Sequence, residues 1–285
     1  MLHFHVPSDC HVEYREIPIS EHRGKTRTMR AMIVRPKEQE GKVPGVLWLH
    51  GGGYVYGFPE MAYFSRAIDL VVGAGAVIVC PNYRTALKSP YPAAIKDSYR
   101  ALLYVKDHAD ELGIDDTRIC VGGESAGGGL TAALCMLAKD RGEVNVAFQM
   151  PLYPMLDNED TPSSADNHEK VWDTPRNHAA WALYLRDLKG QEVPAYASPS
   201  RRRNYEGLPP CYTFVGDIEP FFYETLAFVD ALNRAGVEAK CDVYPNWYHA
   251  YDVNHAESEI SKQAAERFIE EFKLAMLKYR APQKQ

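Results

Sequence analysis

The sequence predicts a single α/β domain, residues 1–285, built on a doubly wound and mostly parallel sheet. The chain contains short apolar runs that do not alternate with polar residues, and such runs are typical of strands buried on both faces. Stretches with helical periodicity lie between these runs. Strands that alternate with helices imply right-handed crossovers, which place helices on both faces of the sheet. A length of 285 residues is normal for one large domain of this class.

The predicted elements follow one another along the whole chain. Residues 12–19 alternate apolar and polar side chains and residues 28–34 do so in part, which predicts an antiparallel pair at a sheet edge. Buried strands are expected at Val46–Leu49, Ala76–Cys80, Ile119–Val121, Val146–Met150, Tyr212–Val215 and Lys240–Tyr244. Helices are expected at Met61–Val72, Ala93–His108, Ala126–Lys139, Phe222–Ala235 and Glu257–Lys273.

One region, residues 157–207, interrupts this alternation. It contains prolines at 162, 175, 194 and 199 and an aromatic helical stretch around 181–188, but no clear strand. We interpret it as an insertion over the sheet edge where the loops gather, in the position of a cap or lid over a substrate pocket. The alternative is an insertion without a functional role.

Composition excludes several classes of function. The net charge is -6 and Arg201–Arg203 is the only basic run, so no nucleic-acid partner is expected. The first residues lack the features of a signal peptide, and no apolar run is long enough to predict a membrane span. The six cysteines have no metal-binding spacing and suit reduced core residues, which predicts a cytoplasmic protein. Composition leaves open whether the chain forms a homo-oligomer.

A candidate nucleophile lies in Gly123-Glu124-Ser125-Ala126-Gly127, which matches G-x-S-x-G. The motif follows the predicted strand at 119–121 and precedes a predicted helix, and this context exposes a serine on a strained turn. Glycines at 123 and 127 remove side chains where strand and helix crowd each other. Backbone N–H groups at the helix N-terminus favour developing negative charge. The alternative is a Gly/Ser-rich turn without chemistry.

A glycine run, His50-Gly51-Gly52-Gly53-Tyr54, follows the predicted strand at 46–49. Acyl transfer needs preorganised N–H donors for an oxyanion, and glycines let the backbone approach that oxygen. We expect Gly52 and Gly53 to provide two donors and Ala126 the third. A phosphate-binding loop is excluded because neither G-x-G-x-x-G nor a following Gly-Lys-Ser/Thr is present. His50 is expected to orient the loop.

The general base and the acid should follow the last two strands, because the triad order in such folds is serine, acid, histidine. His249 lies in the loop after the strand at 240–244, which makes it the candidate base. Asp217 and Glu219 both follow the strand at 212–215. Asp is the usual residue in this role, but the spacing alone leaves both acids open.

Together these residues resemble the bacterial hormone-sensitive-lipase-like carboxylesterase family of the α/β-hydrolase superfamily. The resemblance rests on His50–Gly53, Asn82-Tyr83-Arg84, Tyr91–Ala94, Gly123–Gly128, Gly207–Pro210, Glu219-Pro220-Phe221 and His249. Family members carry Asp-Pro where this chain has Glu219-Pro220, so the resemblance implies that Glu219 is the triad acid. The N-terminal cap of the family is shortened here, and the insertion at 157–207 should supply most of the cap.

The resemblance implies a serine esterase that hydrolyses short-chain acyl esters without a cofactor or metal. Two alternatives stay open: an amidase or peptidase on the same triad, and a non-catalytic relative that only binds a ligand. The expected partner is a small ester. Aromatic residues are candidate pocket walls, because such sites are mostly apolar with few polar groups; they are Tyr54, Trp172, Trp181, Tyr184 and Tyr248.

Overall fold

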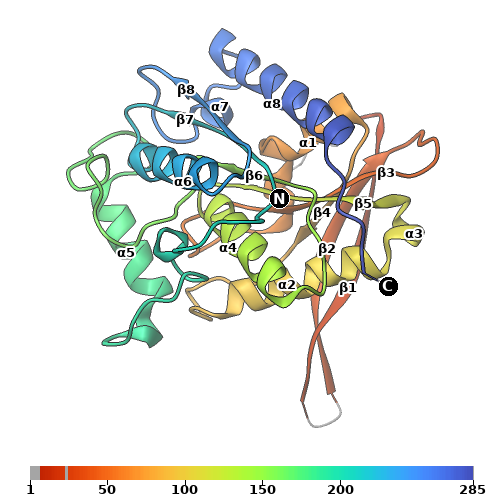
Figure 1. Cartoon of the computed structure of the whole chain (residues 1–285), viewed down its shortest axis with the longest axis horizontal. Coiled ribbons are helices and arrows are strands. Elements are labelled where there is room, and N and C mark those ends of the chain that lie inside the picture. Colours follow the sequence, from red (N-terminus) through yellow and green to blue (C-terminus); the bar gives the residue numbers. More distant parts are fainter. Residues whose placement is uncertain (1–6, 23–24, 285) are drawn as a thin grey trace.

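The structure is a computed structural model that describes residues 7–22 and 25–284. Within these residues, eight strands form one sheet in the order β1-β2-β4-β3-β5-β6-β7-β8 (Figure 1). β1 (Cys10–His22) pairs antiparallel with β2 (Lys25–Pro36), and β2 pairs antiparallel with β4 (Val77–Pro81). All later neighbours in the sheet are parallel. The predicted α/β fold with a mostly parallel sheet is therefore confirmed.

Each predicted buried strand is present. The strands are β3 (Val43–Leu49), β4 (Val77–Pro81), β5 (Ile114–Glu124), β6 (Phe148–Leu152), β7 (Cys211–Gly216) and β8 (Ala239–Tyr244). The side chains of β8 are half-exposed, contrary to the expectation of burial on both faces, because β8 is the last strand of the sheet.

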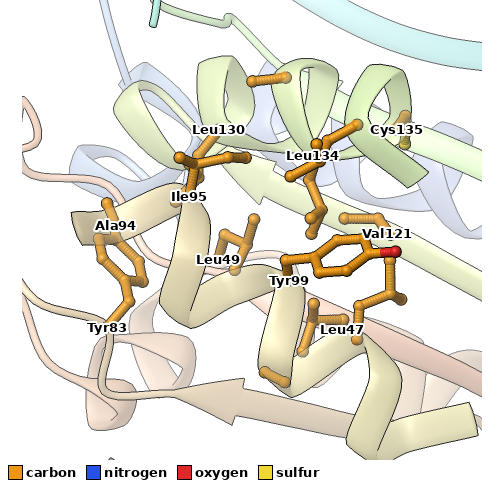
Figure 2. Packing of buried hydrophobic residues seen from close by; sticks show 14 of the residues in the cluster. Leu47, Leu49, Tyr83, Ala94, Ile95, Tyr99, Val121, Leu130, Leu134 and Cys135 are labelled. Atoms are coloured by element: carbon orange, nitrogen blue, oxygen red, sulfur yellow. The ribbon is translucent and has the colours of Figure 1, made fainter. Parts of the chain in front are cut away.

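Helices cover both faces of the sheet. Side chains of α2 (Ala93–Asp107) and α4 (Ala126–Arg141) pack on one face, where Ile95 and Leu134 lie over Leu47 and Val121 (Figure 2). α6 (Phe222–Arg234) packs beside α4. α1 (Ala67–Ala74) and α8 (Glu259–Lys278) cover the opposite face. This two-sided burial fits the apolar, non-alternating character of the central strands.

The predicted helix Met61–Val72 is wrong as a single element. A 3₁₀ helix, Pro59–Phe64, ends before α1, and Ser65 between them has an extended backbone. The Ser65 hydroxyl donates to the Ala62 carbonyl and accepts from the Ala67 N–H, both at 3.1 Å. A serine that satisfies backbone groups on both sides ends one helical segment and begins the next.

Residues 157–207 are all described and contribute no strand to the sheet. Their longest helix is α5 (Thr174–Tyr184), which begins where the Asp173 carboxylate accepts from the Arg176 N–H at 2.9 Å. The Tyr91 N–H donates to the Tyr184 carbonyl at 2.9 Å, which ties the end of α5 to the main domain. The expected shortening of the N-terminal cap falls partly on residues 1–6, outside the described residues.

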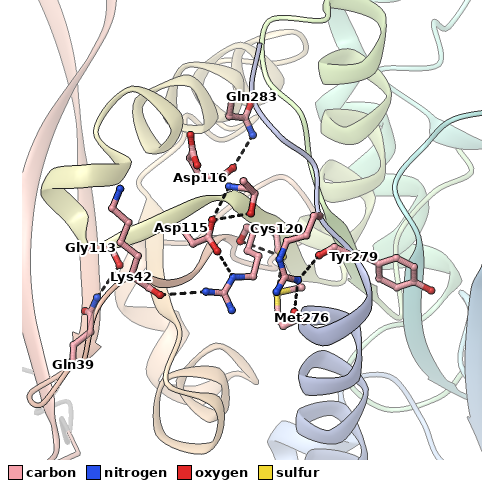
Figure 3. Close-up of polar contacts among 12 residues, drawn as sticks. Gln39, Lys42, Gly113, Asp115, Asp116, Cys120, Met276, Tyr279 and Gln283 are labelled. Carbon is pink, nitrogen blue, oxygen red and sulfur yellow. Dashed lines mark hydrogen bonds and ion pairs between the residues drawn. The ribbon is translucent and has the colours of Figure 1, made fainter. Parts of the chain in front are cut away.

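The end of the described chain crosses the amino end of β5. The Gln283 side-chain amide donates to the Asp116 carbonyl at 2.9 Å (Figure 3). It also donates to the Asn145 carbonyl at 2.9 Å, and the Ala281 N–H donates to the Thr117 carbonyl at 2.8 Å. The carboxyl end of the same strand leads into Ser125. The amino end of β5 therefore binds the C-terminal segment, and its carboxyl end leads into the candidate site.

Two short helices, α3 (Ala109–Leu112) and α7 (Tyr251–Asn254), complete the α-helices of the described residues, and two more 3₁₀ helices lie at Arg186–Leu188 and Pro199–Arg201. None of the helices in residues 7–22 and 25–284 is long and apolar enough to cross a membrane. All six cysteines are free.

Candidate active site

Ser125 stands on a sharp turn between β5 and α4. Its backbone has φ 57° and ψ -120°, a conformation that non-glycine residues rarely adopt. The Ser125 N–H donates to the Leu152 carbonyl, and its own carbonyl accepts from Gly129 and Met155, each at 3.0 Å. These bonds hold the strained residue in place from the neighbouring strand and from its own helix, as expected for a functional site.

Two glycines allow this turn to form. A Cβ atom on Gly127 would lie 2.0 Å from the Leu49 carbonyl oxygen, and one on Gly123 would lie 2.4 Å from the same oxygen. Real Cβ atoms cannot approach a backbone oxygen so closely, so glycine is required at both positions. The strand and helix crowd each other here as the motif predicted.

His249 lies next to Ser125 at the start of a hydrogen-bonded chain. Its Nε2 atom is 2.9 Å from the Ser125 hydroxyl oxygen. Its Nδ1 atom contacts a carboxylate oxygen of Glu219. The Glu219 side chain is fully buried and that of His249 nearly so. The structure thus brings together three predicted residues that lie far apart in the sequence.

The two candidate acids have different partners. Glu219 contacts the imidazole, whereas Asp217 accepts from the Asn246 N–H at 2.6 Å. Asn246 has a positive φ of 62°, so Asp217 satisfies the backbone of a tight turn three residues before His249. Asp217 therefore holds the loop that carries the histidine, and Glu219 orients the ring itself.

Aromatic rings surround the imidazole. The rings of Phe221 and Tyr153 stand edge-on to His249 with centroids at 5.0 and 5.1 Å, and the Trp172 ring lies at 6.4 Å. Such contacts fix the plane of the ring without adding charge. The imidazole can therefore turn little while its two nitrogens face Ser125 and Glu219.

The glycine loop presents free backbone donors beside Ser125. Among the described residues, no carbonyl or side chain accepts from the N–H groups of Gly52, Gly53 or Ala126. Gly52 has φ 105° and its carbonyl accepts from Val55 at 3.0 Å, which closes the loop into a turn. A Cβ on Gly52 would lie 2.1 Å from the Tyr56 carbonyl oxygen, so this turn also requires glycine.

His50 packs against this loop on the side of Tyr83. Its ring is 3 % exposed, stacks on the Tyr83 ring at 4.0 Å, and has its Nδ1 atom 2.8 Å from the Gly51 carbonyl. The Tyr83 hydroxyl donates to the His50 carbonyl at 2.6 Å. Burial lowers the pKa of His50 to about 4, because a buried ring loses the hydration that stabilises its charged form. His50 therefore has the structural surroundings expected of a loop-orienting residue.

A cavity of about 480 Å³ opens above Ser125 and His249. Its wall combines the glycine loop, the segment after it, and the inner side of the 157–207 region. The lining residues include Gly52, Gly53, Val55, Tyr56, Met61, Phe64, Glu124, Tyr153, Val171, Trp172, Arg176, Ala180, Leu183, Ala250 and Val253. Most of this wall is apolar, which is typical of small-molecule sites.

Some predicted wall residues lie elsewhere, which corrects the sequence-based assignment. Tyr54, Trp181 and Tyr248 do not border this cavity. The Tyr54 ring stacks on Tyr184 at 4.1 Å and lies 5.5 Å from Trp181, so all three belong to the core beneath the cap. Tyr248 packs in the core of the opposite sheet face. The remaining candidate, Trp172, does line the cavity.

The sequence did not identify two residues of the cavity wall, the polar Glu124 and the strained Val171. Glu124 was visible only as the unspecified residue of the G-x-S-x-G motif, although it is one of the residues that line the cavity. Val171 has a φ of 69°, which a β-branched residue adopts only under strain, and it precedes Trp172 at the cavity wall. The motif could have drawn attention to Glu124, but no sequence signal marks Val171.

No group of three or more His, Cys, Asp or Glu residues within 7–22 and 25–284 is arranged to hold a metal ion.

Comparisons with known proteins agree with this geometry. The sequence profile of the α/β-hydrolase fold matches residues 46–253. The chain is 33 % identical to esterase LipI of Mycobacterium tuberculosis over 214 residues, which cover 74 % of this chain and 67 % of LipI. It is also 33 % identical to carboxylesterase NlhH of the same organism over 226 residues, 78 % of this chain and 70 % of NlhH.

A solved structure is similar over nearly the whole chain. It is described as a bacterial heroin esterase, and it superposes with a TM-score of 0.88 at 31 % identity. The similarity covers 96 % of this chain and 86 % of that protein. The profile, the relatives and the shared fold agree. The chain therefore belongs to the α/β-hydrolase family, among the hormone-sensitive-lipase-like esterases, and is a carboxylic ester hydrolase.

Proposed function

We propose that Ser125, His249 and Glu219 are the catalytic triad of this esterase and that it hydrolyses short-chain acyl esters. The observation that carries the proposal is the unbroken chain of contacts from the Ser125 hydroxyl through the imidazole to the buried Glu219 carboxylate. This chain lies at the floor of an apolar cavity, where an ester can reach the serine.

The first half of the reaction uses all three residues. The Ser125 oxygen attacks the ester carbonyl carbon while Nε2 of His249 takes the hydroxyl proton. Negative charge on the carbonyl oxygen is stabilised by the free N–H groups of Gly52, Gly53 and Ala126. The ester C–O bond then breaks, and His249 returns its proton to the departing alcohol. An acyl-serine remains.

Water completes the cycle by the reverse path. Neutral His249 takes a proton from water, and the resulting hydroxide equivalent attacks the acyl carbon. The acid is released and the proton returns to Ser125. Glu219 stabilises the imidazolium formed in both halves and keeps the ring in the tautomer whose Nε2 accepts a proton.

The cavity supports a preference for small esters. Its volume of about 480 Å³ falls in the lower half of the range for small-molecule pockets. Aromatic and aliphatic side chains of the 157–207 segment form part of the wall, so acyl and alcohol groups share limited space. We expect turnover of p-nitrophenyl esters to fall steadily from the acetyl to the dodecanoyl chain.

A covalent probe tests the triad. A fluorophosphonate should label the wild-type protein on the peptide that contains Ser125, and mass spectrometry locates the label. Parallel rates on a p-nitrophenyl ester and the matching anilide then separate an esterase from an amidase. A protein that stays unlabelled while it hydrolyses the ester would contradict the proposed serine mechanism.

The cellular location and assembly stay predictions. Six free cysteines fit the cytoplasmic location expected from the sequence, because a reducing compartment keeps thiols unpaired. Sedimentation of the purified protein would establish whether it forms a homo-oligomer.

A further inference from the structure

Glu124, which the proposed triad does not use, places a buried carboxyl beside the nucleophile. Glu124 is 8 % exposed and is one of the residues that line the cavity. A Cβ atom on Gly51 would lie 3.4 Å from the Ser125 Cβ and 3.5 Å from the Glu124 Cγ, so both side chains lie against the same glycine. The Oε2 atom of Glu124 is buried and has no hydrogen-bond partner among the described residues.

The charges around Glu124 leave it without a cation of its own. The nearby guanidinium of Arg66 lies 3.0 Å from the Asp69 carboxylate and 3.4 Å from that of Asp252. Asp252 is fully buried and both its oxygens lack hydrogen bonds among the described residues. One positive side chain therefore faces three carboxyls, and two acids already share it.

The other titratable groups near Glu124 do not supply the missing charge. Cys80, Tyr83 and Tyr153 face it from β4, the following loop and the end of β6, and burial raises the pKa of each well above its ordinary value. These groups are neutral at ordinary pH. Arg176 at the cavity wall is largely exposed and ion-paired with Asp173.

Burial raises the pKa of Glu124 from 4.5 to about 8, and the neighbouring Asp252 carboxylate adds to this shift. The Trp48 side chain, the Gly51 backbone N–H and the charge of Arg66 oppose it only in part. Glu124 therefore favours its protonated form at neutral pH. A cation placed against it would favour the ionised form.

Aromatic residues line the same cavity as Glu124. Tyr56, Phe64, Tyr153 and Trp172 line the same space. Aromatic rings attract ammonium groups through their quadrupole, and a desolvated carboxylate provides the matching charge. We propose that Glu124 and this aromatic wall form a subsite for an ammonium group, so that the enzyme favours esters whose alcohol carries a cation. This inference rests on the proposed function, because the subsite lies within the same cavity.

The subsite predicts a distinctive dependence on pH. A quaternary ammonium ester keeps its charge at every pH, but it needs Glu124 ionised. Its advantage over a neutral ester should therefore rise as the pH approaches and passes about 8. The steps that use Ser125 and His249 are common to both esters, so they cancel in the ratio of their kcat/KM values.

A pair of acetyl esters measures this ratio. Choline acetate carries the quaternary ammonium, and 3,3-dimethylbutyl acetate is its neutral isostere. We expect the ratio of kcat/KM, cationic over neutral, to rise about tenfold or more between about pH 6 and pH 9 in the wild-type protein. A ratio that does not change with pH would overturn the proposal.

Glu124→Gln keeps the shape of the side chain and removes its charge. We expect the ratio to become independent of pH and to fall at about pH 9 to its low-pH value. Asp166→Asn is the matched control, because Asp166 is 88 % exposed in the 157–207 segment. It should leave the ratio unchanged. An unaltered ratio in Glu124→Gln would contradict the subsite.

Binding of tetramethylammonium to the wild-type protein provides a test without a variant and without turnover. It should raise Tm, and it should do so more at about pH 9 than at pH 6. Absence of any such shift would count against the subsite. Failure to hydrolyse the neutral ester would instead contradict the proposed function, so the two failures are distinguishable.

Discussion

The turn that carries Ser125 and the loops that carry Glu219 and His249 meet within hydrogen-bond distance, but the chain builds them in different ways. Residues 119–127 make the turn almost entirely from contiguous backbone, with glycines pressed against the Leu49 carbonyl. The two loops begin after separate strands, β7 and β8, and meet through side chains. The turn is a local structure, and the acid–base pair is a tertiary one.

This difference has a consequence for substitution. In the turn, Gly123 and Gly127 on either side of Ser125 are pressed against backbone atoms, so the backbone there has little room to shift. In the loops, contacts can be removed one at a time: the Glu219 carboxylate, the Asp217 bond to Asn246, and the rings around His249. Variants on the two sides of the site should therefore show graded effects.

The largest loss is expected from Ser125→Ala. Without the nucleophile, kcat for a short ester should fall by about 10⁴-fold or more, because triad residues act as a unit. Ser98→Ala is a control, since Ser98 is buried on α2 and its hydroxyl has no partner among the described residues. Steady-state kinetics with circular dichroism checks both variants. More than a tenth of wild-type activity in Ser125→Ala would refute the assignment.

The second-largest loss of kcat is expected from substitution of the proposed acid, Glu219. Glu219→Gln keeps the shape but removes the charge that stabilises the imidazolium, and we expect kcat to fall by roughly 10²–10⁴. Asp217→Asn should cost less than about tenfold, because its amide oxygen can still accept from Asn246. Glu219→Asp should recover only part of the activity, since the shorter side chain does not reach the ring as well. The opposite ranking of the two amide variants would transfer the role to Asp217.

A smaller loss of activity is expected from Gly53→Ala, because Gly53 in the glycine loop lies against Trp172 in the cap. A Cβ atom on Gly53 would lie 2.4 Å from the Trp172 ring, so Gly53→Ala must displace that ring or the loop. We expect kcat to fall by about tenfold, because small displacements of positioning groups are costly. Adding Trp172→Ala to the same chain should restore part of the loss. A double variant no better than Gly53→Ala would show that the loop itself is distorted.

The smallest effect concerns stability and pH. The raised pKa of Glu124, from 4.5 to about 8, means that the folded protein retains a proton that the unfolded chain releases. This contribution is complete below about pH 4.5 and is lost as the pH rises through about 8. Glu124→Gln has no such proton, so its Tm relative to wild type should increase by a few degrees over that range.

Differential scanning calorimetry at several pH values checks this prediction. Glu257→Gln serves as a control, because Glu257 is 81 % exposed and should show no comparable trend. A Tm difference between Glu124→Gln and wild type that stays constant would mean that Glu124 is ionised in the folded protein at all these pH values.

The comparison also explains which features the sequence could predict. The strands, the turn at Ser125 and the glycine loop depend on short contiguous patterns, and they were located correctly. The choice between Asp217 and Glu219 depends on which one faces the imidazole, and only the resemblance to the family favoured Glu219. Spacing along the chain contains no such information.

The cavity wall was the least predictable feature. Tyr54 and Trp181 were plausible wall residues, but they stack with Tyr184 in the core beneath the cap. An aromatic side chain suits a pocket and a core equally well, and the packing of α5 on the main domain decides between them. Glu124 was missed for a related reason, because the segments that bury it lie far apart in the sequence.

His50 has a consequence for kinetic titrations. It directly precedes the glycine run in the sequence, and its Nδ1 atom lies 2.8 Å from the Gly51 carbonyl, so an ionisation there would alter the electric field at the reacting carbonyl. Burial lowers its pKa to about 4, so it remains electrically constant from mildly acidic to alkaline solution. Any change in rate across that interval therefore originates from other groups. The charge beside the proposed oxyanion loop therefore stays constant while the remaining groups titrate.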